Sequence, residues 1–372
     1  MKKRYKTLFV IQDLGGGGAE KVLINLVNNM DSELFEITVL ALFGGGENEK
    51  LLGSHIRYWN MWRRPYKGNS FFMKLFTPAF LHRMIVREDF DIEVAYLEGA
   101  SHRIVCGCND PRARLFAWQH SFPQTREGAY IGFNSINESD KYYKRYDKIV
   151  CVSKSIKDKF EGWHPDLRNL TVAYNTNESE WIQRLSMEPV EENIFNDGEI
   201  RLIGVGKITR NKGFDRLARI HKRLTDAGYP VHTYILGTGA DQDGITQYLK
   251  DNNIESSFTF LGYQSNPYKY MSKCHAYVCS SYSEGFSTAA TEALIIGIPV
   301  VTTSVSGMKE MLGENNEYGI VTENTENALY EGIVSLINSQ ERLSYYHNKA
   351  LERSAVFNTK TTVKKVEQLL IK

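Results

Sequence analysis

The sequence predicts an α/β protein made of two Rossmann-like halves. Short apolar segments typical of strands alternate with amphipathic helical segments, and this alternation runs through the chain twice. Such alternation is typical of parallel sheets covered by helices, with ligands at the carboxyl ends of the strands. The length of 372 residues favours two domains of about 180 residues over a single one.

Apolar runs in the first half predict a series of short strands. They cover residues 8–11, 37–42, 92–96, 114–118, 148–152 and 171–174. The segment 19–29, which follows the first of these strands, reads as an amphipathic helix. Its apolar face is formed by Val22, Leu23, Leu26 and Val27. We expect this first domain to extend over residues 1–187.

A second series of strands and helices follows. The strands are expected at 201–205, 231–236, 258–261, 276–279 and 300–303, and helices at 214–227 and 245–252. The acidic, turn-rich segment 188–198 is the expected linker, so the second domain would cover residues 199–357. The segment 358–372 has a helical pattern. Its apolar face contains Val363, Val366, Leu369 and Leu370.

The composition excludes several classes of protein. With 42% hydrophobic residues, 24% charged residues and a net charge of +1, the chain has an ordinary soluble composition and no global attraction to nucleic acid. Its cysteines form no Cys-x-x-Cys pair, which favours free thiols in a reducing compartment. The apolar run after the basic start is too short for a signal peptide, and no run of about 18 apolar residues predicts a membrane span. We therefore expect a cytoplasmic protein.

The segment 283–292 carries the strongest functional signal. Glu284 stands just before a predicted helix that Ser287 or Thr288 can cap, and Glu292 lies about one turn inside this helix. The backbone amides that would converge at the helix N-terminus are those of Gly285, Phe286 and Ser287. A helix N-terminus is a ready anion site. A phosphate there, beside carboxylates that accept hydrogen bonds from sugar hydroxyls, describes a nucleotide-sugar site.

Two further loops follow predicted strands. A glycine run ends the first strand and leads into a helix, where backbone amides can approach an anion closely. It consists of Gly15, Gly16, Gly17 and Gly18. A glycine run can also be a flexible connection, and this one does not fit the G-x-G-x-x-G spacing well, which disfavours a nicotinamide enzyme. After the strand 201–205, Lys207, Arg210 and Lys212 form a basic loop that is either a phosphate grip or a solvated turn.

Together these motifs resemble the retaining GT-B glycosyltransferases of glycosyltransferase family 4, which act in bacterial polysaccharide synthesis. Glu284 and Glu292 fit the E-x7-E signature of that family, and the glycine run is similar to its glycine loop. Residues 204–215 look like its Gly-Arg…Lys-Gly phosphate grip, with Lys207 where arginine is usual. Lysine binds a phosphate as a point charge and lacks the two parallel N–H donors of arginine. It is therefore less selective for the geometry of the bound phosphate. The resemblance covers nearly the whole chain and is most specific over 200–303.

The resemblance implies the GT-B fold. Two Rossmann-like domains would face each other across a cleft that holds the active site. The N-terminal domain would be the acceptor side, and the C-terminal domain would bind most of the nucleotide-sugar donor. A C-terminal helix, at about 358–372, would cross back to the N-terminal domain.

The resemblance also implies roles for individual residues. Lys207 and Lys212 would neutralise the diphosphate, Glu284 would lie beside the donor sugar, and Glu292 would hold the ribose hydroxyls. The alternative for Glu292 is an exposed acid that favours the helix dipole. The remaining donor contacts would come from Gly16, Gly17, Gly18, Gly285, Phe286 and Ser287. Catalytic roles would fall to Glu284, His120 and Lys212.

Other candidate residues follow predicted strands of the first half. His120, after the strand 114–118, would face the donor sugar by the same resemblance, and its alternative is a structural histidine bound to a neighbouring loop. Glu98 would either meet the acceptor or cap a helix, and Asn175 reads as structural. The Asp-x-Asp pairs at 89–91 and 241–243 spell a metal–diphosphate motif, but capping and chance explain them and the lysines already neutralise the diphosphate. We expect no metal and no cofactor.

Residues 57–87 combine basic and aromatic side chains without any acid. Such a composition suits an anionic bilayer surface and would allow peripheral membrane contact. A core helix with a solvated basic face is the alternative. No nucleic-acid motif accompanies the stretch, so nucleic acid is not expected as a partner.

These observations predict a metal-independent, retaining glycosyltransferase. It would move a sugar from a nucleoside-diphosphate sugar to a glycan or lipid-linked glycan acceptor in cell-surface polysaccharide synthesis, in the cytoplasm or at the inner face of the plasma membrane. One alternative is a GT-B phosphorylase or epimerase-like enzyme. Another is a non-catalytic sugar-nucleotide-binding protein.

Overall fold

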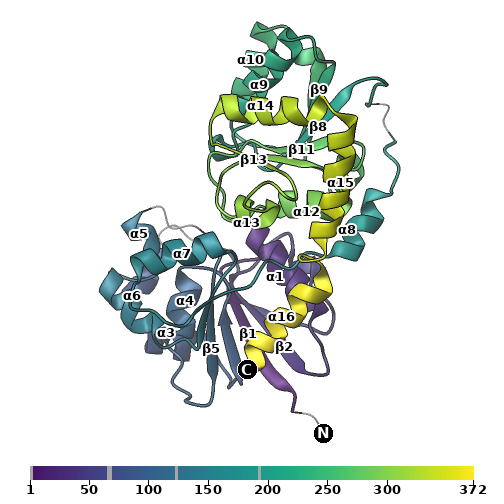
Figure 1. Ribbon diagram of the computed structural model, residues 1–372. Helices are drawn as coiled ribbons and strands as arrows, with labels where there is room; N and C mark the ends of the chain where they lie inside the picture. The colour runs from purple at the N-terminus through teal and green to yellow at the C-terminus, as the bar shows by residue number, and fades with distance from the viewer. Residues whose placement is uncertain (1–2, 65–68, 122–124, 192–193) are drawn as a thin grey trace. The chain divides into compact units, whose positions relative to one another are not determined.

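The computed structural model describes residues 3–64, 69–121, 125–191 and 194–372, with the backbone alone for residues 69–71. The chain forms two compact units (Figure 1). One consists of Met1–Asn177 together with Thr359–Lys372, and the other of Glu178–Asn358. Each unit contains one parallel sheet with helices packed on it, which is the Rossmann-like arrangement expected from the alternating pattern.

The first unit has a seven-stranded parallel sheet in the order β3-β2-β1-β4-β5-β6-β7. Its strands are β1 (Tyr5–Ile11), β2 (Phe35–Phe43), β3 (Arg57–Trp62), β4 (Ile92–Ala95), β5 (Arg114–Gln119), β6 (Lys148–Cys151) and β7 (Leu170–Val172). The strand order reverses at β1, which pairs with β2 on one side and β4 on the other. In sheets of this kind, ligands bind outside the carboxyl ends of the strands at such a switch point.

Helices complete the first unit and bury their apolar faces against the sheet. They are α1 (Gly18–Asn29), α2 (Asn69–Lys74), α3 (Pro78–Ile85), α4 (Ala100–Val105), α5 (Arg126–Ala129), α6 (Ile136–Tyr143), α7 (Lys154–Trp163) and α16 (Thr359–Ile371), with a short 3-10 helix at Glu49–Leu51. The core between them is lined by side chains of β1, β2 and the inner strands, as the near-continuous apolar runs of these strands predict.

Helix α16 follows the whole second unit in the sequence but packs in the first. It buries Val363, Val366 and Leu370 and contacts α1. The Arg114 guanidinium donates to the Leu370 carbonyl at 2.8 Å, and the Asp31 amide donates to Glu367 Oε1 at 2.7 Å. The expectation that the last helix returns to the first domain is confirmed.

The second unit has a six-stranded parallel sheet in the order β10-β9-β8-β11-β12-β13. Its strands are β8 (Ile200–Val205), β9 (Val231–Leu236), β10 (Phe258–Gly262), β11 (Ala276–Cys279), β12 (Val300–Thr303) and β13 (Ile320–Thr322). Its helices are α8 (Ser179–Ser186), α9 (Phe214–Asp226), α10 (Gln242–Asp251), α11 (Tyr268–Met271), α12 (Thr288–Ile296), α13 (Met308–Leu312), α14 (Glu326–Ile337) and α15 (Gln340–Ser354), with 3-10 turns at Arg210–Lys212 and Glu255–Ser257. No helix in the described part of either unit is both long and apolar enough to cross a membrane.

The division of the chain differs from the expected boundary at 187. Residues 178–187, which we expected in the first domain, group with the second unit because α8 packs on α11 and α12. Ser272 donates to the Ser186 carbonyl at 2.8 Å, and Asn266 donates to the Leu185 carbonyl at 3.0 Å. The expected linker 188–198 includes residues 192–193, which lie outside the described residues.

Docking of α16 should contribute directly to the stability of the first unit. Leu370 is fully buried, so Leu370→Ala leaves a cavity and should lower the free energy of unfolding by about 2–3 kcal/mol. The neighbouring Ile371 is 38% exposed, and Ile371→Ala should cost less than about 0.5 kcal/mol. Urea titrations of both variants measure the difference, and equal effects would contradict the docking.

Candidate active site

Glu284 and Lys212, two of the predicted catalytic residues, form an ion pair in the second unit. Lys212 Nζ donates to Glu284 Oε1 at 2.6 Å, and Ser281 Oγ donates to the same oxygen at 2.6 Å. The Lys212 side chain is 30% exposed and the Glu284 side chain is 10% exposed. An ammonium group has three donors, so Lys212 can hold Glu284 and still offer N–H groups to a ligand.

Two loops converge to make this pair, one from β8 to α9 and one from β11 to α12. The first passes through Gly213, whose φ of 63° lies in the left-handed region. A Cβ at position 213 would lie 2.0 Å from the Ser280 carbonyl oxygen of the second loop. Glycine is therefore required here both by backbone conformation and by the close approach of the two loops. The Tyr282 amide also donates to the Asn211 carbonyl at 2.8 Å, which joins the loops further along.

Arg216, on α9, binds the backbone of the loop between β11 and α12. It was not identified from the sequence. It is 2% exposed, and its guanidinium donates to the Ser280 carbonyl at 2.6 Å and to the Ser281 carbonyl at 2.9 Å. A further N–H donates to Asn324 Oδ1 at 2.9 Å. Burying this cation is tolerable because its donors are satisfied. Its position one turn before the buried Ile220, on the apolar face of the helix, was the available signal.

Glu292 is buried inside α12, at 6% exposure. The Tyr268 hydroxyl, from α11, donates to Glu292 Oε1 at 2.9 Å. The alternative of an exposed acid that only favours the helix dipole does not fit this burial. Tyr268 was not identified from the sequence, because nothing in the pattern links α11 to α12.

The start of α12 lies directly after Glu284. Of the two capping candidates, the helix uses Ser287, whose Oγ accepts from the Ala290 amide at 3.3 Å, and it ends at Gly297 with φ 86°. Phe286 is buried against the loop of Gly307. Gly285 and Phe286 therefore come just before the N-terminus of α12, where the helix dipole favours an anion. Lys207 lies in the exposed turn after β8 and does not join the ion pair of Lys212.

The glycine run of the first unit lies between β1 and α1, with Gly17 at the N-cap position. Acidic side chains border this run. A Cβ at Gly16 would lie 2.5 Å from Glu47 Oε1, and a Cβ at Gly17 would lie 2.0 Å from Glu20 Oε2. A hydroxyl group that donates to these carboxylates suits the surroundings of Gly16, Gly17 and Gly18 better than a bare anion does.

His120 follows β5 in the first unit, next to the Tyr96 ring at 4.9 Å between centroids. Burial lowers the pKa of His120 to about 4, and a hydrogen bond with the Tyr96 backbone opposes the shift. The imidazole is therefore neutral near pH 7. Its Nε2 is buried and has no hydrogen-bond partner among the described residues.

Two other polar atoms of the first unit share this condition. Gln119 Oε1 and Asn175 Oδ1 are also buried without a partner in the described structure. Buried polar atoms are nearly always paired, so these positions are suited to polar groups of a ligand or to water. One carboxylate oxygen of Glu98 is engaged in the same area, because Oε1 accepts from the His120 amide at 2.6 Å and the Ser121 amide at 2.5 Å. It fixes the loop after β5 instead of capping a helix.

Neither Asp-x-Asp pair assembles with other described residues into a group with metal-ligand geometry. Asp91 accepts from the Lys6 amide and from Lys3 Nζ, both at 3.0 Å. Asp241 stands at the N-cap of α10, and Asp243 lies in the first turn of that helix. Asp243 suits the dipole of α10, but the Asp241 side chain makes no capping hydrogen bond there.

Comparison with known proteins identifies the family. Residues 16–176 match the family described as Glycosyltransferase Family 4, and residues 188–353 match the family described as Glycosyl transferases group 1. The chain belongs to the family 4 glycosyltransferases. The two matches together cover most of both units, which agrees with the resemblance found in the motifs.

Similar proteins match this family 4 glycosyltransferase over 54% to 99% of its length. It is 25% identical over 94% of both chains to the N-acetylgalactosamine-N,N'-diacetylbacillosaminyl-diphospho-undecaprenol 4-alpha-N-acetylgalactosaminyltransferase of Campylobacter jejuni. It is 27% identical to the capsular polysaccharide biosynthesis glycosyltransferase CapM of Staphylococcus aureus, over 54% of this chain and 55% of CapM. The structure of Anabaena HepE in complex with UDP and glucose matches with a TM-score of 0.79 and 17% identity over 99% of both chains. The fold is therefore GT-B, as expected.

Loss of the Lys212 ammonium should weaken the grip on the donor diphosphate. Lys212→Ala should slow transfer roughly 30- to 1000-fold, the effect of losing one preorganised contact to developing charge, about 2–4 kcal/mol. Nucleotide affinity, measured by calorimetry, should fall as well. Lys250→Ala, an exposed lysine on α10, is the matched control. Unchanged nucleotide affinity in Lys212→Ala would show that this lysine does not hold the diphosphate.

The lowered pKa of His120 predicts a loss of stability in acid. The unfolded chain takes up a proton near pH 6.5 and the folded imidazole only near pH 4, so the free energy of unfolding falls as pH drops between these values. Between pH 7 and pH 5 this single group should account for about 2 kcal/mol. Urea titrations at pH 7 and pH 5 measure this effect. On going from pH 7 to pH 5, His120→Gln should lose less free energy of unfolding than wild type. The control His55→Gln, at an exposed position, should behave as wild type.

Proposed function

We propose that the protein is a retaining glycosyltransferase that moves a sugar from a nucleoside-diphosphate donor to a lipid-linked glycan. The observation that carries this proposal is the Lys212–Glu284 pair at the N-terminus of α12. The pair brings a cation and a carboxylate together in the loop that leads into α12, and these groups suit the negative charge and the hydroxyls of a sugar diphosphate.

The arrangement favours departure of the diphosphate. As the glycosidic bond breaks, negative charge grows on the leaving phosphate oxygens. Lys212 would stabilise that charge, helped by Lys207 from the exposed turn after β8 and by the amides after Glu284. Interactions that strengthen during bond breaking accelerate the reaction. Neutralisation by lysines and amides removes the need for a metal ion, so we propose metal-independent transfer without a cofactor.

We also propose that the transfer retains the configuration of the sugar. An inverting enzyme needs a general base on the acceptor side, opposite the leaving group. We propose instead that the acceptor attacks from the face that the diphosphate leaves, and that a leaving phosphate oxygen takes the acceptor proton. Glu284 would then orient the donor sugar, Glu292 would bind the ribose hydroxyls, and His120 Nε2 would contact a sugar hydroxyl as a neutral imidazole.

The relatives support an acceptor of the polysaccharide type. The name of the Campylobacter jejuni relative describes a diphospho-undecaprenol acceptor and an alpha linkage, and CapM is named for capsular polysaccharide biosynthesis. A lipopolysaccharide core glycosyltransferase of Rhizobium meliloti is 22% identical over 78% of this chain and 76% of its own. We therefore place this chain in cell-surface polysaccharide synthesis, at the cytoplasmic face of the membrane that carries the lipid-linked glycan.

Turnover with a panel of UDP-, GDP- and ADP-sugars tests the function. With a polyprenyl-diphosphate-linked glycan as acceptor, one donor should release its nucleotide and give an α-linked product from an α-linked donor, as shown by proton NMR of the new anomeric centre. The rate should be the same with and without added Mg²⁺ or Mn²⁺. A β-linked product would overturn retention, and binding of a nucleotide sugar without any release would favour the non-catalytic binding protein.

Peripheral membrane contact is proposed for the region 57–87. Strand β3 directs Trp59 and Trp62 onto the core, whereas α2 and α3 expose large apolar side chains. The exposed ones are Phe72, Leu75, Phe80 and Met84. Arg83 and Arg87 are exposed on and beside α3. The alternative core helix is therefore absent at 57–62, where the chain forms a strand that packs on the core. The interfacial surface is proposed for α2, α3 and the residues beside them.

Vesicle flotation tests this surface. The protein should float with phosphatidylglycerol vesicles and not with phosphatidylcholine vesicles, because each basic residue near an anionic surface is worth about 1 kcal/mol. The double variant Phe80→Ser and Met84→Ser should lose most of the bound fraction. Leu351→Ser, at an exposed apolar position of the second unit, is the control, and equal binding of both variants would exclude the surface.

A further inference from the structure

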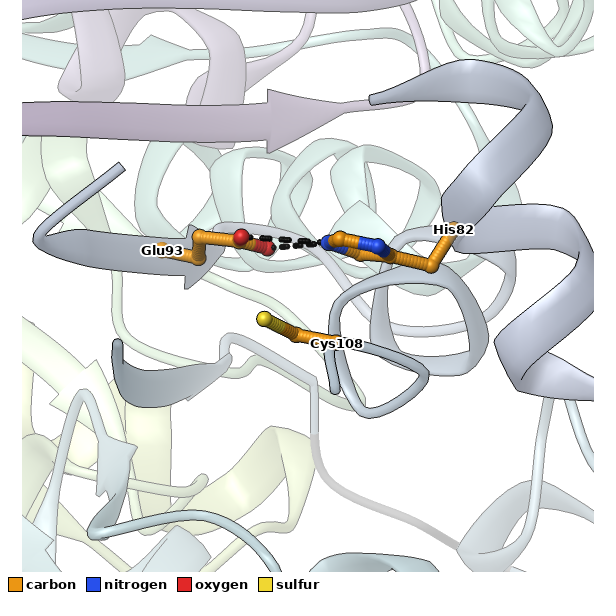
Figure 2. Close-up of side chains that lie close together, drawn as sticks. All are labelled: His82, Glu93 and Cys108. Atoms are coloured by element: carbon orange, nitrogen blue, oxygen red, sulfur yellow. Dashed lines mark hydrogen bonds and ion pairs between the residues drawn. The ribbon is translucent and has the colours of Figure 1, made fainter. Parts of the chain in front are cut away.

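The first unit contains a cluster of three side chains that the transfer reaction does not use. His82 lies on α3, Glu93 on β4 and Cys108 in the loop after α4. Figure 2 shows the imidazole, the carboxylate and the thiol pointing toward one another. One ligand atom from each lies within 4.8 Å of the others. We propose that these three residues form a binding site for a zinc-class divalent ion.

The ligand set favours zinc over the hard cations. Nitrogen, sulfur and oxygen donors from histidine, cysteine and a carboxylate are those that bind Zn²⁺, whereas Mg²⁺ and Ca²⁺ prefer oxygen alone. Around a tetrahedral zinc ion the ligand atoms are separated by roughly 3.3–3.6 Å, given bond lengths of about 2.0–2.3 Å. His82 Nε2 lies 2.8 Å and 3.1 Å from the two Glu93 oxygens. Small side-chain movements would therefore admit the ion.

Burial gives the cluster a reason to bind a cation. Glu93 is 1% exposed on β4, an inner strand of the sheet, and its carboxylate is paired with the His82 imidazole at 2.8 Å. A buried carboxylate needs such a partner, and a divalent ion bound by both side chains would provide one. The Cys108 thiol is also buried, at 3% exposure. A divalent ion would neutralise both the carboxylate and the thiolate, and the thiol proton would pass to solvent on binding. His82 is 15% exposed, so the fourth position faces the more accessible side and suits a water ligand.

The elements that carry the three ligands are held in place independently of any ion. The Arg145 guanidinium donates to the Cys106 and Cys108 carbonyls, both at 2.6 Å, which fixes the loop that carries Cys108. A Cβ at Gly107 would lie 2.0 Å from the Pro78 carbonyl oxygen, so this loop packs tightly on the first turn of α3. Glu93 is held by β4, which pairs with β1 and β5. Such prior positioning is what a specific metal site needs.

The position of the cluster argues for a structural role. Glu93 lies near the amino end of β4, whereas Glu98 and His120 follow the carboxyl ends of β4 and β5. An ion here would link α3 and the Cys108 loop to the sheet without touching the residues proposed for transfer. Zinc binding at this cluster is therefore independent of the proposed transfer mechanism.

Metal content of the full-length, tag-free protein tests the site. After reconstitution with ZnCl₂ and dialysis, elemental analysis should find about one zinc per chain, and Cys108→Ala should lower zinc affinity at least about tenfold, the minimum expected for loss of a direct ligand. Cys106→Ala is the matched control, because Cys106 is buried in the same loop but its thiol donates to the Arg103 carbonyl at 3.3 Å. This variant should retain the metal.

Two further measurements keep the test decisive. Should Cys108→Ala not fold, His82→Gln removes a ligand that is partly exposed and should lose zinc while circular dichroism shows a folded chain. Co²⁺ added in place of zinc should give a thiolate charge-transfer band in wild type that Cys108→Ala or His82→Gln abolishes or weakens. Wild type that holds no zinc after reconstitution, or zinc retained equally by the ligand variants, would show that the cluster is only a hydrogen-bonded core.

Discussion

The second unit depends on one buried guanidinium for the shape of its candidate site. Arg216 reaches from α9 to the carbonyls of Ser280 and Ser281, immediately after β11. Its rigid, planar fork of donors specifies where those carbonyls lie, which a flexible lysine would not do. The loop that carries Glu284 is thereby fixed to the helix that follows Lys212. This buried contact helps to hold Lys212 and Glu284 close enough to form their ion pair.

Much of the fold could be predicted from the sequence because parallel strands read as apolar runs and their helices as amphipathic segments. Strand β3 escaped prediction because it begins a stretch whose basic and aromatic residues look like a surface segment. The short strand β13 was also missed. The residues of the candidate site could be predicted from sequence motifs, but the contacts between them could not. The contact between Lys212 and Glu284 depends on two loops meeting at Gly213, and the burial of Glu292 depends on Tyr268 from another helix.

The two units present different electrostatics at the ends of their sheets. In the second unit a lysine, a carboxylate and a helix N-terminus meet, which suits a ligand with both negative charge and hydroxyls. In the first unit the histidine is neutral and acidic side chains border the glycine run, which suits uncharged hydroxyl-rich groups. The polar groups that each unit offers at this edge of its sheet therefore differ in charge.

The return of α16 to the first unit has a consequence for synthesis in the cell. A ribosome completes residues 178–358 before it makes the helix that covers α1 and bonds to Arg114. Domains made early usually fold as units while the rest of the chain is still being translated. Here the apolar surface that α16 covers stays uncovered until the second unit has been synthesised, so the length of the second unit sets how long α1 lacks this helix.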